Sequence, residues 1–156
     1  MDDLIRVLPS IVRAAGEAEE VAEAAVMVAW RRAAGDGLRP HAIPFRLYRK
    51  TLIVSVMDRT WQKQLEAMSG QLLFRINSLL GQAMITFIEF RIDPATVKKE
   101  RAEAAAVRRE AIRDEKALRR AAGALSSAAA EAIHDAALRR RFLLAAGSCL
   151  ERREKE

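Results

Sequence analysis

Residues 43–57 read IPFRLYRKTLIVSVM, and this stretch decides the fold. Apolar side chains recur at every second position on either side of Arg49-Lys50, first as Ile43, Phe45 and Leu47 and then as Leu52, Val54 and Val56. A period of two is that of a β-strand with one buried face. We therefore predict a hairpin that turns at Arg49-Lys50, with Arg46 and Tyr48 pointing away from the Phe45/Leu47 face.

A long helix is predicted directly after the hairpin. From residue 61 to residue 80 the apolar positions keep helical spacing, as Trp61, Leu65, Met68, Leu72, Ile76 and Leu79. Asp58 or Thr60 can cap the start of this helix, and Gly81 can end it. A third strand is predicted at Met84–Ile92, and because a helix precedes it, the chain must reach this strand by a crossover.

Two further helices are predicted before the hairpin, at Asp3–Ala15 and Glu17–Ala34. Pro9 predicts a kink or a restart in the first helix because it has no N–H to donate. Gly35 can end the second helix with a positive φ, and Trp30 is predicted to pack in the core. The order of elements predicts an α+β domain over residues 1–93, a three-stranded sheet with helices on one face.

After Pro94 the composition changes, and residues 94–156 are predicted to form a basic, α-helical C-terminal extension. Lys98–Leu125 is rich in Ala, Arg and Glu, which favour helix. Ser126 and Ser127 can cap a short segment that reaches His134. Asp135 can cap a last helix with an apolar side made of Leu138, Phe142, Ala145 and Cys149. Cys149 is predicted to be a small packing residue rather than a reactive thiol.

Five landmarks lie in a characteristic order and spacing in the first part of the chain. They are Trp30-x4-Gly35, His41-x2-Pro44, Leu52-x-Val54-x-Val56, Trp61-x3-Leu65 and Asn77-x3-Gly81. Over residues 20–92 the chain resembles the amino-terminal domain of the DciA family, bacterial proteins that assist loading of the replicative helicase. The resemblance implies a KH-like α-β-β-α-β core that binds the hexameric replicative helicase and promotes its placement on single-stranded DNA without hydrolysing ATP.

Catalytic chemistry is poorly supplied by this sequence. It has no GxxxxGK[ST] loop for ATP phosphates, and neither His41 nor His134 has a cysteine or a second histidine at metal-ligand spacing. His41 is predicted to be a loop residue that hydrogen-bonds to backbone. We therefore expect no catalytic residues, no metal, no cofactor and no small-molecule substrate. The acidic N-terminus does not resemble a signal peptide, and no apolar run approaches the roughly 20 residues that span a bilayer. A cytoplasmic, nucleoid-associated protein without membrane contact is expected.

The charge distribution favours polyanionic partners, through phosphate neutralisation and counterion release. The net charge is +6, and the excess of cations begins at the hairpin, because residues 1–34 carry a net −2. The candidate residues for single- or double-stranded DNA are Arg46, Tyr48, Arg49, Lys50, Arg59, Lys63, Arg91, Lys98, Lys99, Arg108 and Arg109. The candidate contacts to a protein partner are Trp61, Phe87, Leu138 and Phe142.

Several alternatives stay open at this point. A face that mixes cations with flat apolar groups suits stacked single-strand bases or a protein partner, and the C-terminal helices could instead cover it. Trp61 could be a core anchor rather than a contact. An RNA-binding module is a second reading, although the Gly-x-x-Gly loop with which KH domains clamp nucleic acid is absent at Gly81-Gln82-Ala83-Met84. An adaptor that pairs with a partner helix is a third reading, and a merely soluble basic protein is the simplest.

Overall fold

The computed structural model describes residues 2–125 and 131–155. It divides the chain into two compact units, Met1–Arg101 and Ala102–Glu156. Helix α4 (Pro94–Ala124) begins where the extension was predicted to begin, and the division falls inside this helix. The first turns of α4 therefore belong to the first unit.

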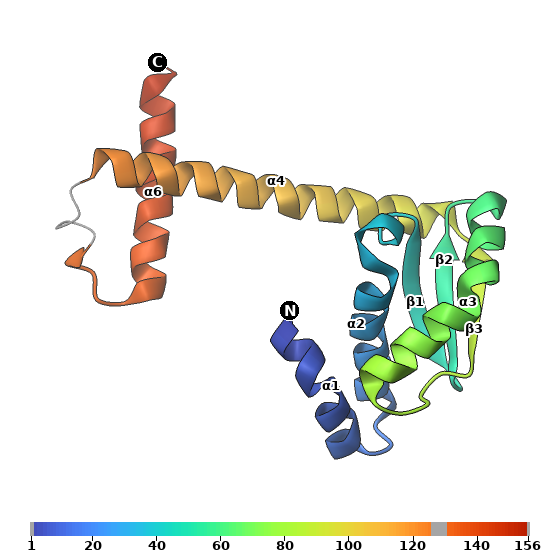
Figure 1. Ribbon diagram of the computed structural model, residues 1–156. Coiled ribbons are helices and arrows are strands. Elements are labelled where there is room, and N and C mark those ends of the chain that lie inside the picture. The colour runs from blue at the N-terminus through green and yellow to red at the C-terminus, as the bar shows by residue number, and fades with distance from the viewer. Residues whose placement is uncertain (1, 126–130, 156) are drawn as a thin grey trace. The chain divides into compact units, whose positions relative to one another are not determined.

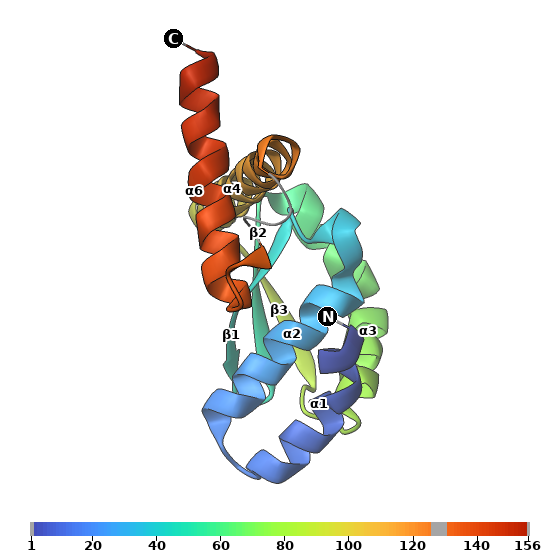
Figure 2. The same cartoon turned by 90° about the vertical axis from the view of Figure 1, so that its left-hand side faces the viewer.

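The first unit is an α+β domain built on one mixed sheet (Figure 1). Its strands are β1 (Ala42–Tyr48), β2 (Thr51–Val56) and β3 (Phe87–Ile92), in the order β1-β2-β3. β1 and β2 pair antiparallel, and β2 and β3 pair parallel, so the predicted hairpin and crossover are both confirmed. Helices α1 (Asp2–Ala15), α2 (Glu19–Leu38) and α3 (Arg59–Leu80) form the other layer (Figure 2).

The core lies between the sheet and these helices. Every second residue of β2 is fully buried there, namely Leu52, Val54 and Val56, together with Leu65, Leu72 and Ile76 of α3. Trp30 is buried as predicted, and its indole Nε1 donates a hydrogen bond to the Ala42 carbonyl at 3.3 Å. Burying one such large side chain contributes about 1.5–3 kcal/mol. The predicted helical stripe is interrupted at one position, because Met68 is 38% exposed and is not part of the core.

The helix ends are set by local side-chain and backbone chemistry. Asp58 caps α3 by accepting a hydrogen bond from the Trp61 N–H at 2.9 Å, so Thr60 is not needed. Gly81 ends the same helix with a φ of 71°. α2 begins two residues later than predicted and is interrupted rather than ended at Gly35, whose φ is 68°. α1 continues through Pro9 as one helix, so no restart occurs there.

The third strand is shorter than predicted, because it begins at Phe87 and not at Met84. The Asn77 side chain pairs with the backbone before it. Its Oδ1 accepts hydrogen bonds from the N–H groups of Met84 and Ile85, and its Nδ2 donates to the Ile85 carbonyl. A side-chain amide thus takes the place of a neighbouring strand at these residues. This is the structural role of the Asn77-x3-Gly81 landmark.

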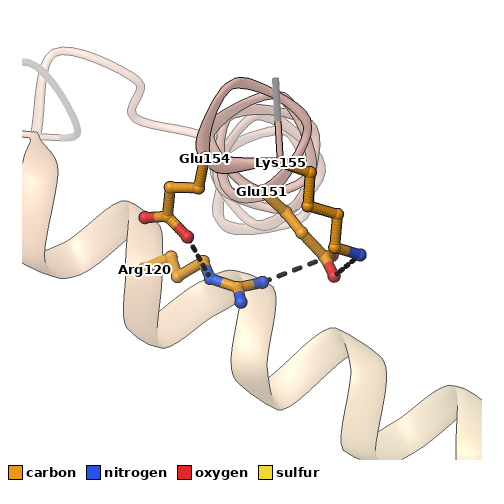
Figure 3. A network of polar contacts seen from close by, with 4 residues as sticks. All are labelled: Arg120, Glu151, Glu154 and Lys155. Atoms are coloured by element: carbon orange, nitrogen blue, oxygen red, sulfur yellow. Dashed lines mark hydrogen bonds and ion pairs between the residues drawn. The ribbon is translucent and has the colours of Figure 1, made fainter.

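The second unit pairs the C-terminal part of α4 with α6 (Ala136–Glu154), whose start Asp135 caps as predicted. The two helices approach closely at Gly147, as shown by the overlap that a β-carbon added there would have with the Ala117 carbonyl. Arg120 of α4 bridges Glu151 at 3.3 Å and Glu154 at 3.6 Å (Figure 3). Lys155, and then Arg120, hold the pKa of Glu151 below its ordinary value.

Two predictions about the extension need separate comment. Cys149 is exposed, so its predicted packing role is wrong, because α6 turns Gly147 toward α4 and carries position 149 out to solvent. The predicted capped segment at Ser126 and Ser127 lies outside the described residues. Within residues 2–125 and 131–155, no helix combines the length and the apolar character needed to cross a membrane.

Candidate nucleic-acid interface

The sheet has a second face, on the side away from the core, and the strand register defines it residue by residue. Thr51, Ile53 and Ser55 alternate with the buried residues of β2 and so belong to this face. Residues paired with them share their side of the sheet. The resulting rows across the three strands are Tyr48–Thr51–Phe87, Arg46–Ile53–Glu89 and Ile43–Ser55–Arg91. We call this set the outer face.

A β-bulge adds an aromatic residue to the strand that carries part of this face. The register of β1 against β2 shifts between Pro44 and Arg46, so that Phe45 and Arg46 together oppose Ile53. The prediction that Ile43, Phe45 and Leu47 share one buried face is therefore wrong for Phe45, which is 56% exposed, and for Ile43, which pairs with Ser55 on the outer face. Leu47 packs against the core. Strict alternation fails because one residue is inserted into the pairing. Pro44 lies in an edge strand, as its missing donor requires.

On the outer face, exposure differs along the central strand, which is partly exposed at the hairpin end and buried farther along, although Arg91 on β3 is exposed at the far end. Tyr48 and Phe87, beside the hairpin turn, are 56% and 60% exposed. Ile53 is 8% exposed and Ser55 only 2%. Ser55 hydrogen-bonds to Asp93, just before α4, and hydrogen bonds from Thr96 and Ser55 lower the pKa of this carboxyl. The outer face is therefore open across all three strands only at its hairpin end, which we call the accessible end.

Cations surround the accessible end. Arg46 is exposed on the outer face, and Arg49 and Lys50 form the turn next to it. The guanidinium carbon of Arg49 lies 5.4 Å from the centroid of the Tyr48 ring, within cation–π range. Arg91, in the third row, pairs with Glu89 at 2.7 Å, and this carboxylate raises the pKa of the guanidinium.

The backbone conformation of the hairpin turn is unfavourable for Arg49 and Lys50. Arg49 and Lys50 have φ values of 43° and 63°, in the left-handed region that Asn and Gly adopt far more readily. Two consecutive positive values match the tight type I′ hairpin turn. The Lys50 carbonyl also accepts hydrogen bonds from the N–H groups of Thr86 and Phe87, which ties the turn to the start of β3. Backbone strain of this kind concentrates at functional sites.

The structure brings only part of the predicted nucleic-acid set together. Arg46, Tyr48, Arg49, Lys50 and Arg91 belong to the outer face or its turn. The rest lie on helices: Arg59 and Lys63 on α3 in the core-side layer, Lys98 and Lys99 on the first turns of α4, and Arg108 and Arg109 in the second unit.

Trp61 belongs to a polar and aromatic stack that sequence reasoning missed. The His41 ring lies parallel to the Trp61 indole, with centroids 4.1 Å apart. Arg101 donates to the Pro40 carbonyl, and its Nη2 lies 2.8 Å from His41 Nδ1. His41 lies in a turn and its backbone N–H donates to the Leu38 carbonyl at 2.9 Å, as predicted for a loop residue, but its side chain contacts Trp61 and Arg101. Only the landmark His41-x2-Pro44 hinted at a role for this histidine, and nothing in the sequence connects it with Arg101.

The remaining predicted partner contacts lie in different places. Phe87 is on the outer face, whereas Leu138 and Phe142 are exposed one helical turn apart on α6. Within the described residues, no group of three His, Cys, Asp or Glu side chains could hold a metal ion.

Comparison with known proteins extends over the first unit. The family model described as "Dna[CI] antecedent, DciA" matches residues 3–90, more than half of the chain. A UPF0232 protein of Mycolicibacterium smegmatis is 30% identical over 89 residues, which are 57% of this chain and 45% of that protein. A UPF0232 protein of Mycobacterium marinum is 32% identical over 74 residues, 47% of this chain and 40% of that protein. The chain thus spans less than half the length of these curated relatives.

Proposed function

This chain belongs to the DciA family, and from that premise we propose that it is a non-enzymatic accessory protein of bacterial DNA replication. It binds the hexameric replicative helicase and single-stranded DNA, and it promotes placement of the helicase on that strand. It does not hydrolyse ATP itself, and it works in the cytoplasm at the nucleoid.

The observation that supports DNA binding most strongly is the accessible end of the outer face. Tyr48 and Phe87 are each more than half exposed there, and Arg46, Arg49 and Lys50 lie beside them. Within the described residues, none of these three cations has a carboxylate partner. Exposed rings stack on bases of any sequence, and unpaired cations neutralise phosphates. We therefore place single-stranded DNA on this surface.

The protein partner is assigned to different residues. Leu138 and Phe142 form an exposed apolar pair on α6, at the spacing with which a helix docks into a groove. Trp61 is only partly buried, and His41 supports its ring from one side. These three side chains are the proposed helicase contacts, which leaves Phe87 to the DNA.

The test compares two double variants in one pair of assays. Arg46→Ala with Arg49→Ala removes two cations at the accessible end. Arg6→Ala with Arg75→Ala removes two exposed cations from α1 and α3, in the helix layer. Affinity for a labelled single-stranded oligonucleotide is measured at about 50 and 200 mM salt, where several phosphate contacts change binding by orders of magnitude. Loading of the helicase from the same bacterium onto single-stranded DNA is then followed with each variant.

We expect the outer-face variant to bind DNA more weakly, with a flatter salt dependence, and to load helicase poorly. The helix-layer variant should behave as the unchanged protein. Equal loss in both variants would contradict the assignment of this surface. A wild-type protein that binds an RNA oligonucleotide of the same sequence much more tightly than DNA would favour an RNA-binding module instead.

A further inference from the structure

One row of the outer face has an aromatic residue at each end, which the other two rows do not have. Tyr48 and Phe87 lie at its two ends, on the outer strands, and Thr51 lies between them on β2. Neighbouring strands are about 4.8 Å apart, so the Cα atoms of the two aromatic residues are separated by about 10 Å. A small side chain between two exposed rings leaves room above it.

The size of this room matches one planar ring. Carbon atoms in contact are about 3.5–4.0 Å apart, so a flat group held between two parallel rings spaces them by about 7–8 Å. Rings whose Cα atoms lie about 10 Å apart reach that spacing by leaning a little toward each other over Thr51. The row is thus wide enough for a single base and too narrow for a base pair lying across it.

The hairpin turn beside this row carries two positive charges, and its backbone conformation is unfavourable for the residues that carry them. Arg49 and Lys50 both hold positive φ values in a two-residue turn where Asn-Gly would be relaxed. Arg49 remains beside the Tyr48 ring, and neither side chain has a carboxylate partner within the described part of the chain. Two cations next to two exposed rings complement a phosphate attached to an unpaired nucleoside.

We propose that Tyr48 and Phe87 clamp one unpaired base of single-stranded DNA above Thr51, while Arg49 and Lys50 hold the adjoining phosphates. This inference rests on the proposed DNA binding and adds its mode, one stacked base at the hairpin end. The buried end of the face, at Ser55, takes no base. The clamp also explains why strained cations occupy the turn.

The test separates stacking from charge by using two oligomers of equal length. One is oligo-dT, and the other is an abasic deoxyribose-phosphate chain with the same number of phosphates. Full-length wild type, Tyr48→Ala, Phe87→Ala and Phe74→Ala are compared. Phe74 is the matched control, because it is 72% exposed on α3 in the helix layer. Thermal melting of each variant confirms that the fold is kept.

We expect wild type and Phe74→Ala to prefer oligo-dT over the abasic chain by roughly 5- to 150-fold, the range for one stacked base. Tyr48→Ala and Phe87→Ala should each lose most of this preference while binding the abasic chain as before. The clamp is overturned if wild type shows no preference, if both variants retain it, or if they lose abasic binding as well. Loss of helicase binding with base preference retained would also overturn it. In each of these cases cation-dependent DNA binding, and with it the proposed function, can still stand.

Discussion

The first unit buries large apolar side chains such as Trp30 and Leu72 between a sheet and its helices, whereas the buried residues described in the second unit are Ala117, Ala121 and Gly147. A buried methyl group contributes about 0.8 kcal/mol, several-fold less than a buried leucine or tryptophan. The α4–α6 pair therefore depends on close backbone approach, on ion pairs and on leucines that are only partly buried, such as Leu118 and Leu144. The first unit thus has the larger apolar core, and we expect the pairing of helices within the second unit to be weak enough to respond to salt and acid.

The largest effect should follow from emptying the core of the first unit. Trp30→Ala removes a buried indole and its hydrogen bond to Ala42, and we expect the free energy of unfolding to fall by about 3–5 kcal/mol. Phe74→Ala, which truncates an exposed ring, should change it by less than about 0.5 kcal/mol. Urea denaturation followed by circular dichroism measures both. If Trp30→Ala lowers the free energy of unfolding by less than about 1 kcal/mol, this core is not the main source of the unit's stability.

A smaller effect, confined to the second unit, should follow from a single methyl group. Gly147→Ala places a β-carbon on the Ala117 carbonyl, and overpacking of this kind costs about 1–3 kcal/mol. Gly123→Ala has open space around its β-carbon and should stabilise α4 slightly, because alanine favours helix. Amide hydrogen exchange should speed up in residues 136–154 for the first variant alone. Faster exchange in the sheet as well would show that the two units are not independent.

Relaxing the hairpin turn should change stability and binding in opposite directions. Arg49→Asn with Lys50→Gly suits the positive φ values, and we expect the first unit to gain about 1–2 kcal/mol for the strain relieved. The same change removes two cations and should weaken binding to single-stranded DNA. Thermal melting and an oligonucleotide titration on the same sample provide the comparison. If the variant is more stable and binds DNA equally well, the turn does not contribute to DNA binding.

The smallest effect concerns the ion pairs of Figure 3. Arg120→Gln breaks the bridges to Glu151 and Glu154 and should lower the melting temperature of the second unit at low salt. The difference should vanish near 1 M salt, where the Debye length is about 3 Å. Arg119→Gln is the control, because its partner Glu115 lies in the same helix.

Acid should also remove the stabilisation that the ion pair between Arg120 and Glu151 gives to the second unit. In the folded unit the pKa of Glu151 is lowered below its ordinary 4.5, first by Lys155 of the same helix and then by Arg120 of α4, so the part that Arg120 contributes is complete above pH 4.5. The effect is lost as the pH falls through the lowered pKa. An effect of Arg120→Gln that ignored both salt and acid would show that packing, and not charge, joins the helices.

Much of the fold could be predicted from periodicity, and the misses have local causes. Two apolar patterns predicted the hairpin, the crossover and the buried face, namely Leu52-x-Val54-x-Val56 and the stripe from Trp61 to Leu79. The bulge at Phe45 could not be predicted, because an inserted residue leaves the apolar alternation of the sequence intact. The late start of β3 depends on the Asn77 side chain, whose hydrogen bonds exist only once the fold has formed.

The candidate site was predicted in part. Alternation correctly placed Arg46 and Tyr48 on the same face, but it could not exclude Arg59 and Lys63, which are close in sequence and lie in the other layer. The stack of Trp61, His41 and Arg101 joins residues up to 60 positions apart, and no sequence period reports such a contact.

Binding of single-stranded DNA to the accessible end of the outer face should leave a footprint on the backbone amides. Amide hydrogen exchange is measured on the full chain with and without saturating oligo-dT. We expect slower exchange in residues 45–53 and 86–89, around the turn and the Tyr48–Thr51–Phe87 row, with α1 and α3 unchanged. Protection confined to α1–α3, with the hairpin exchanging as in the free protein, would show that DNA does not bind this surface.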